Sequence, residues 1–297
     1  MSWLNQIAAN EPLLKQLLLV FTLVLSRTSG LLMTAPVLGT RDVPLRVRAL
    51  LAFTLAVLIT PTQLGVLVDE PSDAAALVLE PVRSAAPIDW GTGTDDPGNL
   101  VNYLVVLGSE IVLGVAMGLG ILLLFIAVQV AGQIIGQMSG MAVPNVLNPT
   151  LESDVPLLSQ LLHVVTLAVF VTIGGHREVM DALLATFGAV PLGGGEVSAT
   201  LVDTLITVAT ESFALGIRIA APVATALLLS TVVLGLIGRT LPQLNILVVG
   251  FGLNTMISLA TLSLSLGALG WLFQDQFDVT LGQLFEAVTS TSAKGGP

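Results

Sequence analysis

The chain has 297 residues, of which 54% are hydrophobic and 10% charged, and its formal net charge is −10. A soluble domain carries about 25% charged residues, so this composition excludes an ordinary soluble protein and indicates an integral membrane protein. The absence of cysteine excludes disulfides and thiolate metal sites, and the negative charge excludes a nucleic-acid partner.

The N-terminal third gives the clearest topology. A retained apolar helix, rather than a cleavable signal peptide, is predicted over 13–34, interrupted late by Arg27. The connection 35–48 holds three arginines against one aspartate, so the positive-inside rule places it in the cytoplasm. Helix 49–68 is then expected to cross the membrane, which places the acidic segment 69–99 on the non-cytoplasmic side. We expect this segment to be a solvated loop, with a specific docking loop as the alternative.

The rest of the chain is predicted to be helical as well. Several segments are longer or shorter than the roughly 20 residues that cross a bilayer. Pro222 removes a backbone donor and predicts a kink. The further helices are expected over 101–140, 155–173, 179–190, 201–237 and from 246 to about 273. The predicted fold is an all-α integral membrane protein of broken and kinked helical hairpins, with a single domain over 1–275 and a partly disordered tail over 276–297.

Glycine and glutamine residues form a seam along the last part of the central helix, expected over 101–140. Residues four apart lie on one helical face, and the two rows are offset by about 60°. Glycine allows another backbone to approach closely, whereas a glutamine facing hydrocarbon would leave its amide unsatisfied. The seam is therefore predicted to face another helix of this chain, a neighbouring subunit or a hydrated pore. Its members are Gln129, Gly132, Gln133, Gly136, Gln137 and Gly140.

The stretch after the seam, up to residue 149, carries no charge and contains two prolines and two asparagines. Irregular backbone at membrane depth is tolerated only where protein buries it or where it lines a cavity. A gating or plugging loop and an ordinary exposed connector both remain open. The candidate plug residues are Met138, Met141, Pro144, Asn145, Asn148 and Pro149.

A second group of polar residues is predicted to be structural. Glu110 is either an intramembrane functional acid or a residue at the membrane interface near the start of its helix. Glu211 and Arg218 are two helical turns apart and are expected to pair directly or through water. The complete group is Glu110, Glu211, Arg218, Arg239, Gln243 and Asn245.

The sequence contains no zinc-protease, serine-hydrolase or phosphate-loop motif, so we expect no enzyme, no metal and no cofactor.

Several stretches, taken in order, resemble the FliR family, the flagellar members of a group that includes the SpaR-type proteins of virulence secretion. They are SRTSGLLMTAPVLGTRDVPLRVRALLA at 26–52, AGQIIGQMSG at 131–140 with NP at 148–149, and GRTLPQLNILVVGFGLN at 238–254. Glu110 followed by Gly114 and Gly118 fits the central helix of the family. The chain departs from the family pattern at Asn148, Gly252 and Asn254, and its acidic segment 69–99 is longer than the usual connection.

The resemblance implies a component of the flagellar export gate, multi-pass in the bacterial inner membrane at the basal body. FliP-like and FliQ-like subunits would pack with it in a helical assembly, beside FlhB-like and FlhA-like proteins. Unfolded flagellar proteins would pass through this gate, with loop 137–155 as the plug.

Two other functions stay open from the sequence. A secondary transporter or channel with broken helices would use Pro222, Glu110 and Glu211 as coupling residues. A structural scaffold of the export apparatus would never contact the exported protein.

Overall fold

The computed structural model describes residues 2–36, 43–69, 97–140, 157–190, 192–193, 198–241, 243 and 246–293. All regular structure within these ranges is helical, which confirms the predicted all-α fold. The helices are α1 (Ser2–Thr34), α2 (Leu45–Asp69), α4 (Pro97–Met138), α6 (Leu157–Thr172), α7 (Gly175–Ala189), α8 (Ala199–Thr240) and α9 (Ile246–Ala293).

Five of the described helices are long and apolar enough to cross a bilayer, and a sixth span results if α6 and α7 count as one. α6 and α7 meet at a bend of 63°. The break between them contains Gly174, whose φ of +80° lies in the left-handed region that glycine adopts without a steric penalty. The bend falls in the gap between the helices expected over 155–173 and 179–190.

The last helix continues further than the sequence indicated. The tail expected from residue 276 onwards is helical as far as Ala293, as a direct extension of α9. Phe277, Leu284 and Val288 in this extension are fully buried. Their spacing of seven and four residues gives the segment one continuous apolar face, which favours helix over a disordered end.

The structure divides into two compact units, and the single domain expected over 1–275 stays a prediction. The first consists of Met1–Leu122, Arg177–Ile206 and Leu281–Pro297, and the second of Leu123–His176 and Thr207–Thr280. Three long helices, α4, α8 and α9, each contribute residues to both units, so no linker separates the units along the chain.

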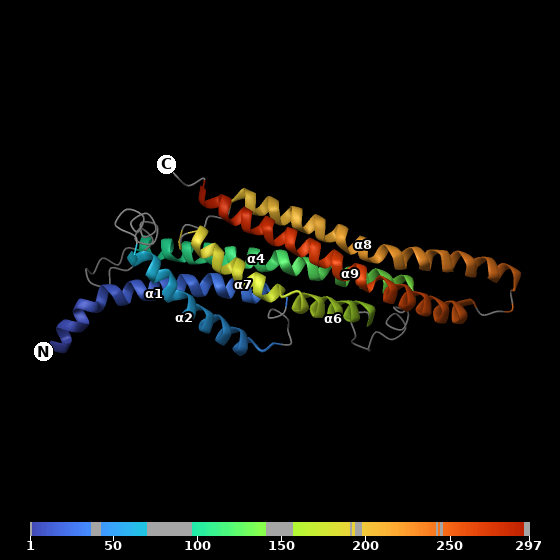
Figure 1. Cartoon of the computed structure of the whole chain (residues 1–297), viewed down its shortest axis with the longest axis horizontal. Coiled ribbons are helices and arrows are strands. Elements are labelled where there is room, and N and C mark those ends of the chain that lie inside the picture. Colours follow the sequence, from blue (N-terminus) through green and yellow to red (C-terminus); the bar gives the residue numbers. More distant parts are fainter. Residues whose placement is uncertain are drawn as a thin grey trace. The chain divides into compact units, whose positions relative to one another are not determined.

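In the first unit, α1 and α2 lie side by side and antiparallel (Figure 1). α1 also contacts the first half of α4, backbone against backbone. A methyl group added at Gly30 would lie 2.5 Å from the carbonyl oxygen of Ile111, and one added at Gly114 would collide with the carbonyl of Arg27. These two glycines therefore set the register that brings Arg27 beside Glu110.

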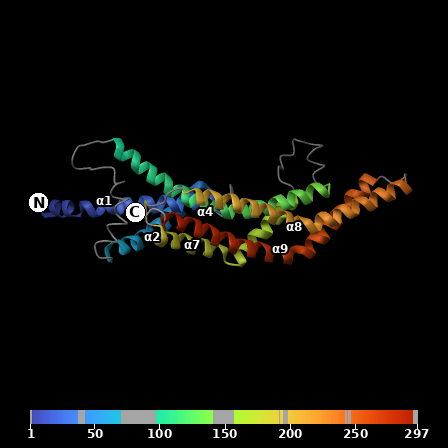
Figure 2. The same cartoon turned by 90° about the horizontal axis from the view of Figure 1, so that it is seen from above.

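In the second unit, α8 and α9 run antiparallel as a long hairpin (Figures 1 and 2). An aromatic cluster ties α4, α6 and α9 together. The ring of Phe125 on α4 packs edge-to-face against Phe170 on α6, at 5.5 Å between centroids, and against Phe273 on α9, at 5.4 Å. Phe277 extends the cluster along α9. Edge-to-face pairs of this kind add stability beyond the area that they bury.

Candidate functional site

A buried ion pair joins α1 to α4 in the first unit. The Nε atom of Arg27 donates to Oε2 of Glu110 at 2.5 Å, and the side chains are only 1% and 0% exposed. Arg27 lies one turn before Gly30 and Glu110 one turn before Gly114, so the close approach at the two glycines holds the charged groups together. Glu110 is therefore a deeply buried partner in an ion pair.

The same pair reaches the end of α7. Nη1 of Arg27 donates to the carbonyl oxygen of Thr186 at 3.2 Å, and its guanidinium group lies 4.6 Å from the ring centroid of Phe187. Oε1 of Glu110 accepts the backbone N–H of Gly193 at 2.9 Å. The ion pair thus connects three separate stretches of the chain: α1, α4, and the end of α7 with the turn that follows it.

The sequence alone did not indicate Arg27 as the partner of Glu110. Each is a charged side chain inside a long apolar run, and intramembrane charges pair with one another when they are buried in protein. That signal suggests that Glu110 has a partner, but the separation of 83 residues gives no local hint of which residue it is.

The glycine and glutamine seam lies on the second half of α4, in the second unit. Gly132 and Gly136 are buried. A methyl group added at Gly132 would lie 2.5 Å from Cα of Ser159, so α4 and α6 touch at this point. Gly140 ends the helix with a φ of +83°. At Gly132 the seam therefore faces a helix of the same chain.

The glutamines of the seam are not equivalent. Nε2 of Gln129 lies 2.8 Å from Nδ1 of His163, and the hydroxyl of Ser159 donates to the carbonyl oxygen of Gln129 at 2.8 Å. Gln133 is half-buried and Gln137 is exposed. The structure thus adds Ser159 and His163, one turn apart on α6, to the polar strip that the sequence showed on α4 alone.

Most of the candidate plug lies outside the described residues. Met138 is the half-buried last residue of α4. Met141, Pro144, Asn145, Asn148 and Pro149 fall in the stretch 141–156, which the structure does not describe.

The remaining polar residues are spread over the second unit. Glu211 on α8 accepts a hydrogen bond from Nε2 of Gln276 on α9 at 2.9 Å. Arg218, expected to pair with Glu211 directly or through water, is exposed, and that pairing stays a prediction. Arg239 and Gln243 are exposed near the end of the hairpin, and Asn245 lies outside the described residues. Glu211 therefore joins α8 to α9 through an amide.

Among the described residues, no group of three His, Asp or Glu side chains is placed to hold a metal ion.

Comparison with known proteins gives consistent matches over most of the chain. The family model of bacterial export proteins, family 1, matches residues 18–280. The flagellar biosynthetic protein FliR of Escherichia coli (strain K12) is 29% identical over 239 residues, covering 80% of this chain and 81% of that protein. The FliR proteins of Bacillus subtilis (strain 168) and Aquifex aeolicus (strain VF5) are 27% and 26% identical. These alignments cover 88% and 89% of this chain, and 91% and 89% of the relatives.

Proposed function

Because the chain belongs to family 1 of the bacterial export proteins, the FliR family, we propose that it is a subunit of the flagellar protein export gate. It is a multi-span membrane protein of an export family and not an enzyme. FliP-like and FliQ-like subunits complete the channel in the inner membrane at the flagellar basal body, with FlhB-like and FlhA-like proteins beside it. Unfolded flagellar proteins are the cargo.

One observation supports an assembly of this kind: α8 is longer than a bilayer is thick. The helix has 42 residues and is apolar enough to be a span throughout, so it measures about 63 Å. The hydrocarbon core of a bilayer is about 30 Å thick. A helix tilted by about 40° still extends roughly 48 Å along the membrane normal.

Large apolar side chains are exposed along the whole of this helix, among them Ile206, Phe213, Leu229 and Leu236. Lipid cannot cover all of them at once, and contiguous exposed apolar surface of this extent marks an interaction site. We expect other protein subunits to cover the part of α8 that extends beyond the hydrocarbon core of the bilayer.

Copurification tests this proposal. A tagged chain is isolated from its own host in a mild detergent, and the recovered proteins are identified by mass spectrometry. FliP-like and FliQ-like proteins are expected in a fixed ratio to the chain. Recovery of the chain alone, or only as its own oligomer, would contradict the gate and favour a secondary transporter.

The plug is the finer part of the proposal. The loop 137–155 closes the channel, and its uncharged stretch suits a pore that must pass polypeptides of either charge. Deleting 141–150 is expected to leave assembly intact and make the membrane leak small ions. Deleting 81–90, which has the same length but lies in the acidic segment, is the control and should not leak. An ion-tight strain carrying the first deletion would argue against a plug.

A further inference from the structure

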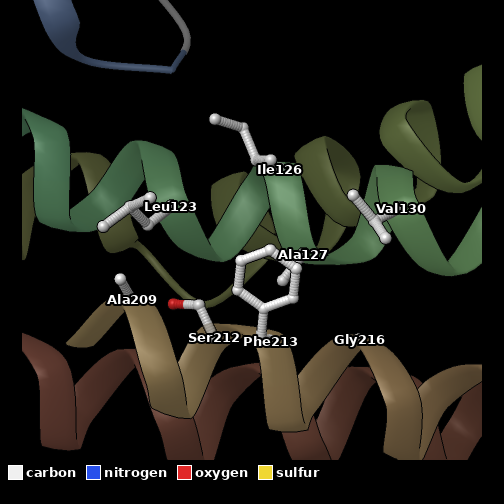
Figure 3. Close-up of a pocket in the computed structure, with 8 residues that line it drawn as sticks. All are labelled: Leu123, Ile126, Ala127, Val130, Ala209, Ser212, Phe213 and Gly216. Carbon is white, nitrogen blue, oxygen red and sulfur yellow. The ribbon is translucent and has the colours of Figure 1, made fainter. Parts of the chain in front are cut away.

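A small apolar pocket lies between α4 and α8 in the second unit (Figure 3). Its volume is about 30 Å³. Two of its residues form an exposed rim, since Ile126 on α4 is 41% exposed and Phe213 on α8 is 65% exposed. Figure 3 shows the ring of Phe213 rising from α8 towards α4 beside Ala127. The pocket therefore opens onto the exposed apolar side of α8, the surface that we propose other subunits cover.

Ser212 places a hydroxyl group in this pocket. The side chain is 2% exposed, and its Oγ atom has no hydrogen-bond partner among the described residues. Other hydroxyl groups on α8 behave differently. Oγ1 of Thr225 donates to the carbonyl oxygen of Ala221 at 2.7 Å, and Oγ1 of Thr231 donates to that of Leu227 at 2.8 Å. The hydroxyl group of Ser212 does not donate to the carbonyl oxygen four residues earlier, and its oxygen points into the space between α8 and α4 (Figure 3).

The chemistry of the pocket narrows what can occupy it. A buried water molecule needs two to four polar partners, and the lining side chains offer one hydroxyl group. A lipid acyl chain would fill the space but would leave that hydroxyl unpaired, which is unfavourable in an apolar surrounding. The group that fits this pocket is small, is apolar where it contacts the lining residues, and has one atom that can hydrogen-bond to the hydroxyl group of Ser212.

We propose that this pocket receives a hydroxyl- or amide-bearing side chain from a transmembrane helix of another subunit of the assembly. Serine, threonine, asparagine and glutamine side chains form such hydrogen bonds between membrane helices. The pocket is narrow because α8 packs against α4 beside it: a methyl group added at Gly216 would lie 2.7 Å from the carbonyl oxygen of Ala127. Only a side chain, and not a helix backbone, can therefore enter it. This inference rests on the proposed function, since it requires a partner subunit in the membrane.

The test uses site-specific photocrosslinking in intact cells. A benzophenone amino acid replaces Phe213 on the rim, and the adduct is analysed by mass spectrometry after copurification of the complex. Leu229 is the matched control, because it is an equally exposed apolar residue of α8 that does not line the pocket. Crosslinking from position 213 is expected to reach one defined apolar helix of a copurifying subunit, at a residue next to a hydroxyl or amide side chain.

Two variants link the crosslink to the pocket. Ala209→Leu fills the pocket and is expected to abolish the crosslink. Ser212→Ala removes only the hydroxyl group and is expected to speed the loss of the partner in detergent about fivefold, the effect of one hydrogen bond. Because Ser212→Ala adds no volume, it reports on docking even if Ala209→Leu prevents folding.

The outcomes separate the inference from the proposed function. A phospholipid adduct alone, a crosslink that Ala209→Leu leaves unchanged, or a rate of partner loss that Ser212→Ala leaves unchanged would overturn the inference. Copurifying subunits would leave the proposed function standing in each case. Absence of any copurifying subunit with the unsubstituted chain would overturn both.

Discussion

Removing one partner of the ion pair between Arg27 and Glu110 should destabilise the first unit strongly. In the variant Glu110→Leu, the guanidinium group of Arg27 stays buried without its counter-charge, and the N–H of Gly193 loses its acceptor. Breaking a buried ion pair in this way costs about 3–5 kcal/mol. That is a large part of the roughly 5–15 kcal/mol by which proteins are stable.

The double variant Arg27→Met with Glu110→Leu isolates the charges from the packing. Replacing both charged groups by apolar side chains of similar volume is often neutral or stabilising, so the double variant should recover most of the loss. Glu110→Gln is the conservative control, because it keeps the shape and an acceptor for Gly193 but removes the charge. It should lie between the other two.

Thermal unfolding of the detergent-purified chain, read by size-exclusion chromatography after heating, measures these effects. Glu110→Leu should lower the midpoint by roughly 5–15 °C, and the double variant should lie within a few degrees of the unsubstituted chain. If the single and double variants lost the same stability, the charges would not be coupled and the reasoning would be refuted.

Two further substitutions test the contacts that build the units. Gly114→Ala should separate α1 from α4 and lower the free energy of unfolding by about 1–3 kcal/mol. Gly108→Ala on the same helix is the control, because an added methyl group there meets nothing within 4 Å, and it should be neutral or slightly stabilising. Equal effects of the two substitutions in a thermal shift assay would show that the contact at Gly114 is unimportant. Gln129→Leu should cost about 0.5–1.5 kcal/mol by removing its half-buried hydrogen bond with Nδ1 of His163. The paired change Gln129→Leu with His163→Leu should recover part of this loss in the same assay; fully additive losses would contradict a coupling between the two side chains.

Much of the fold follows from local sequence signals. Apolar runs predicted the long helices, and the gap between the expected helices 155–173 and 179–190 predicted a break where α6 and α7 meet, at the glycines 174–175. Both signals act over a few residues, because hydropathy and backbone freedom are properties of the residues themselves. The extension of α9 to Ala293 was missed because its charged residues hid the apolar row at Phe277, Leu284 and Val288.

The candidate site was visible in the sequence only as separate halves. The glutamine row on α4 suggested a polar strip, but His163 on α6 was a lone histidine without a neighbouring pattern. Likewise the spacing along α8 suggested only Arg218 as a partner of Glu211, directly or through water, and gave no sign of the hydrogen bond from Gln276 on α9. Spacing along one helix predicts which residues share a face, but not which other helix meets that face.

The sequence by itself therefore determined a multi-span, all-helical membrane protein and carried the motifs of its family. Only the tertiary structure decided that Arg27 meets Glu110, that Gly132 touches Ser159, and that the hydroxyl of Ser212 turns into a pocket. The physical reason is distance along the chain. Burial of apolar surface depends on each segment's own composition, whereas ion pairs, close backbone contacts and unpaired hydroxyl groups arise only when segments far apart in sequence come together.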